Sequence, residues 1–265
     1  MKFVTLKSDK LEVTLCTLGA SIYRIVFDKH DMVLTPKDEK AFLMKHLYYG
    51  KTIGMVCGRI VINNQIVLHG GDEGLSNQEF DYKEELNKVI FSYGKIKVTY
   101  SLNGNELSLD FLVEVDKPTL VALTNHSYFC LGENDIKNLK LKINSHKYIL
   151  VDKDLVPYGS SLISDKYDFS KYGCPIKDGD IDNYFYLDDK NVSLRSDKYS
   201  LDISFDFEGV QLFTDHWIDV TDVLSSEKHS YRSIAIEPED DQLNRKELLP
   251  GQIYQRNIKY RFNKL

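Results

Sequence analysis

Apolar and polar residues alternate along much of this chain, so that every second side chain would lie on the same face of an extended strand. Between two of these stretches stands Asn103-Gly104-Asn105, a glycine-containing turn that predicts a β-hairpin. Ile234 and Ile236 indicate one more short strand. The alternating stretches are 11–15, 96–102, 107–115, 201–207 and 258–262.

Helical periodicity is confined to two short stretches, 39–46 and 223–228. Strands therefore follow strands with turns between them, which predicts an all-β sandwich or closed barrel and not a βαβ fold. The sequence has neither of the glycine-rich nucleotide-binding motifs and no G-x-S-x-G nucleophile elbow. No linker or low-complexity segment divides the chain, and we expect one domain over residues 1–265.

Composition and charge narrow the classes of partner. The 265 residues are 42% hydrophobic and 28% charged, as in ordinary globular proteins, and the net charge of −6 would repel a phosphate backbone. No apolar run approaches the roughly 18 residues of a membrane helix, and Lys7, Asp9 and Lys10 interrupt any signal-peptide core. The four cysteines lack C-x-x-C spacing, which indicates reduced thiols. We therefore expect a cytoplasmic protein that binds neither nucleic acid nor membrane.

Two histidines stand where strand packing does not require a polar residue. His69 lies between Val67-Leu68 and Gly70-Gly71, and taken alone it is typical of a turn with a surface imidazole. His126 belongs to the polar group Thr124-Asn125-His126-Ser127, which has apolar residues on both sides. At the end of a strand such a group can direct an imidazole into a cavity; the alternative is a core histidine bonded to its neighbours.

Two acidic residues also stand near strand ends. Asp182 opens an aromatic strand, where an Asx-turn or a strand cap is the default interpretation. Glu237 continues the strand from Ile234, and we expect Pro238 to end the ladder there. A carboxylate at a buried strand end is costly unless it is paired or functional. The following Glu239, Asp240 and Asp241 are interpreted as a solvated loop.

Together these residues allow a general acid–base site in a cleft of an all-β fold, with a histidine and Glu237 facing each other. No serine or cysteine has an evident neighbouring base, which disfavours nucleophilic catalysis. His69, His126 and Glu237 would also make a His₂-carboxylate metal set. No two of them have the short fixed spacing typical of metal ligands, so we expect no metal ion.

Motifs spread over nearly the whole chain resemble, in the same order, those of the aldose 1-epimerase (galactose mutarotase) family. The most specific is T-N-H-S-Y-F at 124–129, which resembles the family's T-N-H-[TS]-Y-F. Similarly, L-H-G-G at 68–71 matches a family motif, and G-V-Q-L-F-T at 209–214 resembles another. The remaining segments are 18–22, 49–60, 151–159, 167–169, 181–185, 237–238 and 249–254.

The resemblance implies a large antiparallel β-sandwich of the supersandwich, galactose mutarotase-like kind, with a hexose in a central cleft. It implies an isomerase that opens and closes the sugar ring by proton transfers, without metal or organic cofactor. By residue, it implies Glu237 as general base and His126 as general acid. Arg59, His69 and Asp182 would hold the sugar hydroxyls. Tyr128, Phe213 and Trp217 are candidates for stacking on the sugar, with core packing as their alternative role.

The chain also departs from the family pattern. Met55 and Gly58 stand where the family has Arg and Asn, and we expect hydrogen bonds to the sugar to be lost there. Glu239 stands where Gln is common, and the stretch between Arg59 and His69 is short. The choice of sugar and the oligomeric state stay open.

Two alternative functions remain at this point. One is a non-catalytic carbohydrate-binding or regulatory protein on the same fold. The other is a hexose-6-phosphate mutarotase, whose phosphate would need cations at the mouth of the cleft. The candidate cations are Arg195, Arg232, Arg245 and Lys246.

Overall fold

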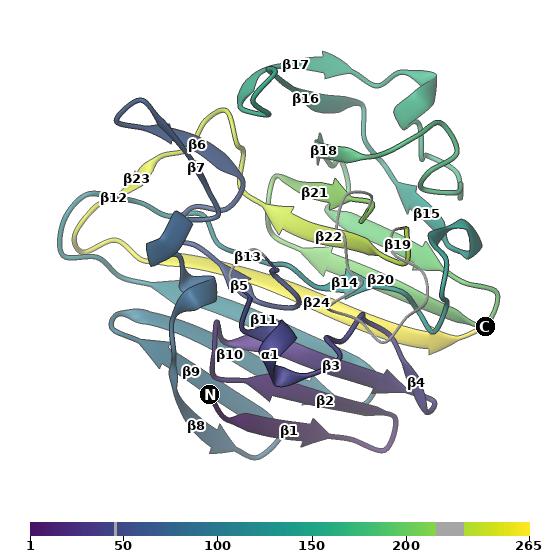
Figure 1. The fold of residues 1–265 in the computed structure, drawn as a ribbon, viewed down its shortest axis with the longest axis horizontal. Helices are drawn as coiled ribbons and strands as arrows, with labels where there is room; N and C mark the ends of the chain where they lie inside the picture. Colours follow the sequence, from purple (N-terminus) through teal and green to yellow (C-terminus); the bar gives the residue numbers. More distant parts are fainter. Residues whose placement is uncertain (45–46, 216–230) are drawn as a thin grey trace.

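The structure, a computed structural model, describes residues 1–44, 47–215 and 231–265. Antiparallel strands joined by short turns make up most of these ranges (Figure 1). The helix expected over 39–46 is the short α1 (Glu39–Phe42), which Asp38 caps. The helix expected over 223–228 and Trp217 lie outside the described residues. None of the described helices is long and apolar enough to cross a membrane.

An eight-stranded antiparallel sheet runs through the middle of the molecule, with the long strand β24 near its centre (Figure 1). The alternating pattern in the sequence forms its strands: the side chains of Ile96, Val98, Tyr100 and Leu102 are buried, and the residues between them are more exposed. The expected hairpin is confirmed, because Asn103 pairs with Glu106 across a two-residue turn. In spatial order the strands are β15 (Lys140–Ile143), β19 (Asn191–Arg195), β20 (Tyr199–Phe205), β24 (Tyr254–Lys264), β11 (Glu106–Val113), β10 (Ile96–Asn103), β9 (Lys88–Tyr93) and β8 (Asp81–Glu85).

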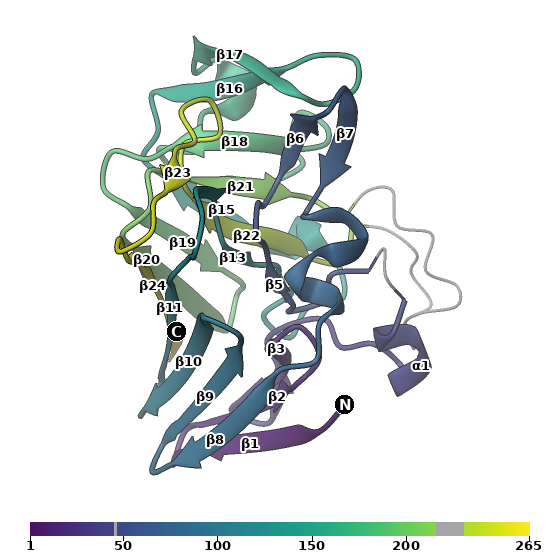
Figure 2. The same cartoon turned by 90° about the vertical axis from the view of Figure 1, so that its left-hand side faces the viewer.

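Two further sheets pack against this one, and a hydrophobic cluster joins all three. Figure 2 shows β1–β3 beside β8–β10 in the lower half, and β18, β21 and β22 in the upper half. Aromatic rings contact each other at both interfaces. Between the four-stranded and eight-stranded sheets, the ring centroids of Phe27 and Phe262 are 6.2 Å apart. Between the six-stranded and eight-stranded sheets, those of Phe129 and Tyr260 are 5.5 Å apart. The predicted all-β sandwich is therefore confirmed. The four-stranded sheet contains β1 (Phe3–Lys7), β2 (Leu11–Cys16), β3 (Ser21–Phe27) and β4 (His30–Asp31). The six-stranded sheet contains β14 (Tyr128–Phe129), β22 (Ile234–Glu239), β21 (Gly209–Phe213), β18 (Asp182–Tyr186), β16 (Lys147–Val151) and β17 (Pro157–Leu162).

Three two-stranded ladders and four short 3-10 turns complete the described structure. The ladders are β5 (Thr52–Ile53) with β13 (Thr124–Asn125), β6 (Arg59–Ile62) with β7 (Gln65–Leu68), and β12 (Thr119–Leu120) with β23 (Glu247–Leu248). The 3-10 turns are η1 (Gly71–Glu73), η2 (Leu75–Asn77), η3 (Ile136–Asn138) and η4 (Asp165–Tyr167).

Strand β22 corrects one expectation, because it continues through Pro238 to Glu239. Pro238 pairs with Val210 on β21. On the other side of β22, strand β14 pairs only with Ile234 and Ala235, so the ladder there ends before the proline. A residue without an N–H is tolerated where one side of a strand is unpaired. Both Glu237 and Glu239 therefore belong to one buried strand.

Candidate active site

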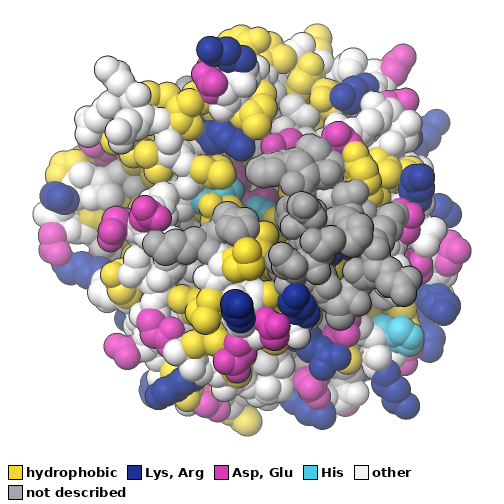
Figure 3. All heavy atoms as spheres, in the orientation of Figure 1, with side chains coloured by type: hydrophobic (Ala, Val, Ile, Leu, Met, Phe, Trp, Pro, Cys, Tyr) yellow, Lys and Arg dark blue, Asp and Glu magenta, His cyan; other side chains and the backbone are white. Residues whose placement is uncertain are grey.

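A cavity of about 460 Å³ opens between the six-stranded sheet and the β6–β7 hairpin. Figure 3 shows histidine side chains at the floor of a hollow on this face. Of the sixteen described residues that line it, eight are aliphatic or aromatic and seven are polar or charged, so the wall can contact both apolar and polar parts of a small molecule. All five residues predicted from the sequence line it: Arg59, His69, His126, Asp182 and Glu237.

Glu237 and His126 face each other inside this cavity. Glu237 lies on β22 and is 1% exposed; His126 lies in the turn between β13 and β14 and is 4% exposed. The pairing of Tyr128 with Ala235 joins β14 to β22 and brings the two elements together. The result is a distance of 3.3 Å between His126 Nε2 and Glu237 Oε1. At this distance both groups can reach neighbouring atoms of one bound molecule.

Burial determines which of the two side chains carries the proton. It lowers the pKa of His126 to about 3. It raises the pKa of Glu237 well above the usual range, and the nearby charges of Glu239 and Asp182 add to this effect. The pair is thus neutral, with its proton on Glu237. Glu237 Oε2 has no hydrogen-bond partner among the described residues, so a donor entering the cavity would favour the carboxylate.

The β6–β7 hairpin brings Arg59 and His69 to the same wall. Its two-residue turn, Asn63-Asn64, has both residues at positive φ, as tight hairpins require. Arg59 then pairs with Leu68, directly before His69. The interpretation of His69 as a surface histidine is wrong, because its side chain is only 8% exposed.

The main chain fixes the tautomer of His69. The backbone N–H of Gly58 donates to His69 Nδ1 at 3.2 Å. Burial lowers the pKa of His69 well below its usual value, so the ring is neutral and its proton lies on Nε2. This nitrogen is a hydrogen-bond donor.

The same tautomer bears on metal binding. The ligand atoms of His69, His126 and Glu237 lie within 4.8 Å of one another, close enough for a cation. A metal on His69 Nε2 would require the proton on Nδ1, which would then face the N–H of Gly58. The donor set therefore fits hydroxyl recognition better than metal ligation.

Asp182 is held at the start of β18 by its neighbours on the sheet. Gln211 on β21 donates from Nε2 to Asp182 Oδ1 at 2.7 Å. Gln211 in turn pairs with Glu237 across β21 and β22. Tyr128 and Phe213 also line the cavity, and they pack on each other with ring centroids 6.3 Å apart. The positions of Tyr128 and Phe213 are thus compatible both with stacking on a ligand and with core packing.

Comparison with known proteins agrees with this geometry. Residues 2–261 match the sequence model of the family described as aldose 1-epimerase. The chain belongs to the aldose 1-epimerase family. Galactose mutarotase of Sus scrofa is 31% identical over 189 residues, covering 58% of this chain and 55% of that protein. The human galactose mutarotase is 28% identical over 269 residues, which cover 82% of this chain and 78% of the human protein. The chain thus spans 55% of the length of the pig relative.

Solved structures of similar proteins have the same fold. A GalM/aldose epimerase homologue from C. elegans superposes with a TM-score of 0.91 at 24% identity, covering 100% of this chain and 99% of the homologue. A galactose 1-epimerase from Lactobacillus acidophilus gives a TM-score of 0.88 at 22% identity, covering 99% and 94%.

Other side chains fill the place of the asparagine that this family member lacks. Gly58 has φ +66°, and a Cβ built on it would lie 3.0 Å from Arg245 Nη2 and 3.2 Å from Gln242 Nε2. Gln242 lines the cavity, so an amide is still present at this wall. Met55 is not among the cavity-lining residues and packs against the hydrophobic core.

Sequence reasoning missed several residues of the cavity. Gln211 stands inside the quoted motif at 209–214, which was the available signal. Gln242 follows the acidic run interpreted as a solvated loop, and that interpretation is wrong for Glu239, which is 0% exposed. The structure also adds Tyr48 and Tyr184 to the wall.

None of the four candidate phosphate-binding cations lines the cavity. Arg195 stacks over Tyr172 at 4.2 Å, and buried Arg232 forms an ion pair with Asp215 at 3.1 Å. Arg245 donates to main-chain oxygens, and Lys246 is exposed. Of the described residues, Arg59 is the one Lys or Arg that lines the cavity.

Proposed function

We propose that this chain is an aldose 1-epimerase that interconverts the α and β anomers of a hexose. The observation that carries the proposal is the opposition of Glu237 and His126 across 3.3 Å inside a cavity. Membership of the family supports the same activity.

The reaction needs two proton transfers. Glu237 removes the proton of the C1 hydroxyl while His126 protonates the ring oxygen, and the bond between C1 and the ring oxygen breaks. The aldehyde rotates about the C1–C2 bond and the ring closes on its other face. His126 then takes back its proton and Glu237 returns its proton to the new C1 hydroxyl. A positioned acid or base typically contributes about 10²–10⁴-fold.

Binding of the sugar would prepare the pair for this step. A hydroxyl that donates to Glu237 Oε2 stabilises the carboxylate, and the displaced proton can move to His126 Nε2. His69 Nε2 would donate to a sugar hydroxyl, Asp182 would accept from one, and Arg59 offers several donors in a fixed plane. Tyr128 and Phe213 present ring surface for the apolar face of the sugar.

The alternatives have less support. A phosphorylated hexose would meet Arg59 as the one Lys or Arg on the part of the cavity wall that the structure describes. A sugar-binding protein without turnover would not need the buried Glu237–His126 pair, which is costly to maintain. We propose the cytoplasm as the compartment, because all four cysteines are free thiols.

Polarimetry of freshly dissolved α-galactose and α-glucose tests the proposed function. We expect the protein to accelerate mutarotation over the spontaneous rate of the same buffer. A protein that binds either sugar in calorimetry without accelerating mutarotation would instead support the non-catalytic alternative. Acceleration only with hexose 6-phosphates would support the phosphate alternative.

The pH dependence of the reaction follows from the burial of Glu237. Burial raises its pKa above the ordinary value of 4.5, and the base acts only when it is deprotonated. We therefore expect kcat/KM to fall as the pH drops, with a midpoint clearly above 4.5. The measurement is polarimetry over a pH series, with the buffer blank subtracted at each pH. A midpoint at or below that of an exposed glutamate would contradict the assignment of Glu237 as base.

A further inference from the structure

Two glutamates project from the same face of β22. Glu237 and Glu239 are two residues apart on one strand, which places their Cα atoms about 6.5 Å apart with both side chains on one side. Both are buried, with exposures of 1% and 0%. Only Glu237 lines the cavity, so Glu239 lies beside the site without reaching it. Buried carboxylates this close usually have a functional reason.

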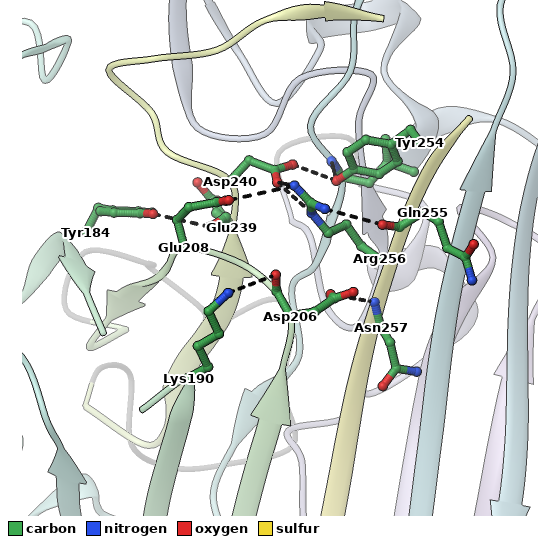
Figure 4. A network of polar contacts seen from close by, with 11 residues as sticks. Tyr184, Lys190, Asp206, Glu208, Glu239, Asp240, Tyr254, Gln255, Arg256 and Asn257 are labelled. Carbon is green, nitrogen blue, oxygen red and sulfur yellow. Dashed lines mark hydrogen bonds and ion pairs between the residues drawn. The ribbon is translucent and has the colours of Figure 1, made fainter. Parts of the chain in front are cut away.

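The carboxylate of Glu239 has few partners for a charge so deeply buried. Its Oε2 accepts from Gln242 Nε2 at 2.7 Å, while Oε1 has no hydrogen-bond partner among the described residues. The hydroxyl of Tyr184 donates to the main-chain oxygen of Glu239, not to its carboxylate (Figure 4). The thiol of Cys57, also buried, contacts the carboxylate as a weak donor.

The charge of Arg245 acts on the Glu239 carboxylate, but it compensates that carboxylate only in part. Its Nη2 donates to the main-chain oxygen of Cys57 at 2.6 Å, and its Nη1 donates to that of Arg59 at 3.2 Å. No ion pair within 4.0 Å joins it to Glu239 in the described part of the chain. Much of the negative charge of Glu239 can therefore act on Glu237.

The other acidic groups nearby are compensated. Asp240 accepts from Tyr254 and Arg256, each at 2.7 Å, as Figure 4 shows. Glu208 lies 3.9 Å from the same arginine. Asp241 accepts from Tyr186, from main-chain Leu243 and from Asn244.

Four titratable groups therefore lie close to Glu237. His126 and His69 face it and are neutral. Asp182 accepts a hydrogen bond from Gln211, and Glu239 carries the less compensated charge. The tyrosines around it, Tyr48, Tyr128 and Tyr260, all have raised pKa values and stay neutral.

We propose that Glu239 is a positioning residue for the reaction, whose buried negative charge makes Glu237 a stronger base. The proposal rests on the proposed function. Two buried carboxyls this close do not readily lose both protons. Burial raises the pKa of Glu239 to about 7, and burial together with Glu239 raises that of Glu237 further. Ionised Glu239 thus increases the affinity of Glu237 for the C1 proton.

Glu239→Gln isolates this charge. The amide oxygen of a glutamine can still accept from Gln242, whose Nε2 also lies 3.4 Å from Gln211 Oε1. Gln211 would therefore still hold Asp182. Glutamine is also the residue common at this position in the family pattern, so we expect the variant to fold. The matched control is Glu208→Gln, which removes the same charge from an exposed residue of the network in Figure 4.

The direct test is a ¹³C NMR titration of the glutamate side-chain carboxyls. The resonance that disappears in Glu237→Gln identifies Glu237. We expect its midpoint to fall by about one to two pH units in Glu239→Gln, from the Coulomb interaction at this separation, and to stay unchanged in Glu208→Gln. Because Glu239 ionises first, while Glu237 is still protonated and neutral, Glu237→Gln should leave the midpoint of Glu239 nearly unchanged. An unchanged Glu237 midpoint in Glu239→Gln would overturn the proposal.

The kinetic test uses the same three proteins. In Glu239→Gln the acidic limb of the kcat/KM profile should move to lower pH by about one to two units, the size of the NMR shift. The plateau value of kcat/KM should fall about 3- to 10-fold, because Glu237 is then a weaker base. A merely structural role would lower the rate equally at every pH. If the wild type does not accelerate mutarotation but its Glu237 midpoint still depends on Glu239, the proposed function fails and the coupling of the two carboxyls stands.

Discussion

Glu237→Gln is expected to lower kcat for mutarotation by about 10³-fold, within the range that a single general base contributes. Glutamine matches glutamate in shape but cannot accept the proton of the C1 hydroxyl. It leaves the 3.3 Å approach to His126 and the cavity wall in place, so hexose should still bind. Polarimetry gives the rate, and calorimetric titration with galactose gives the affinity.

The same substitution should not weaken the fold. The pKa of Glu237 is raised in the folded state, so its favourable contribution to stability is complete below the unfolded pKa. That contribution is lost as the pH rises through the folded pKa, because the carboxylate is then ionised in a buried site. Glutamine never ionises, and Glu237→Gln should therefore be at least as stable as the wild type, most clearly at alkaline pH. Urea unfolding at two pH values measures the difference.

The matched control is Glu85→Gln on β8, which changes a glutamate that pairs with Lys83 and Lys88 at the surface. Its turnover should equal that of the wild type. Glu237→Gln with normal mutarotation would refute the proposed base. Loss of both turnover and folding in Glu237→Gln would point to a structural role instead.

The strands of this fold were predictable because burial on one face leaves a period of two in the sequence. Strand β10 shows why: its alternating apolar residues face the core at every second position. The ends of strands were less predictable. Pro238 looked like a terminus, but the strand continues, and at that residue no described strand pairs with the far side of β22. Where a strand ends therefore depends on its pairing with strands distant in the sequence, and a local sequence pattern cannot predict that pairing.

The order of the motifs predicted that five residues would lie in one cavity, as they do, but it did not predict their arrangement. Nothing local indicates that His126 and Glu237 lie 3.3 Å apart, since their contact depends on the pairing of β14 with β22. Glu239 shows the opposite failure. An acidic run after a proline is usually solvated, but here Glu239 is buried on β22. Its carboxylate accepts from Gln242, and its main-chain oxygen accepts from Tyr184 on β18.

Gly50 is the position where a single added methyl group is expected to be most damaging. Its φ is +62°, and a Cβ built on it would lie 1.7 Å from the carbonyl oxygen of Ile22. Its own backbone joins three segments: its N–H donates to His126 O at 2.9 Å, and its oxygen accepts from the N–H of Ile22 at 2.8 Å. The side-chain amide of Asn125 donates to the same oxygen at 2.7 Å. The clash is with main chain on β3, so no side-chain rotation can relieve it.

Gly50→Ala is therefore expected to lower the free energy of unfolding by more than about 4 kcal/mol, a large part of the roughly 5–15 kcal/mol of a typical domain. The left-handed φ contributes about 1 kcal/mol, and the displaced backbone loses hydrogen bonds of about 1 kcal/mol each. Gly94→Ala separates these terms, because Gly94 has φ +55° but nothing within 4 Å of its Cβ position. It should cost only about 1 kcal/mol. Urea unfolding followed by circular dichroism measures both, and equal midpoints would show that the contact with Ile22 does not govern the site.

Because the same hydrogen bonds hold the main chain of His126, any folded Gly50→Ala protein should also lose mutarotation, whereas Gly94→Ala should keep it.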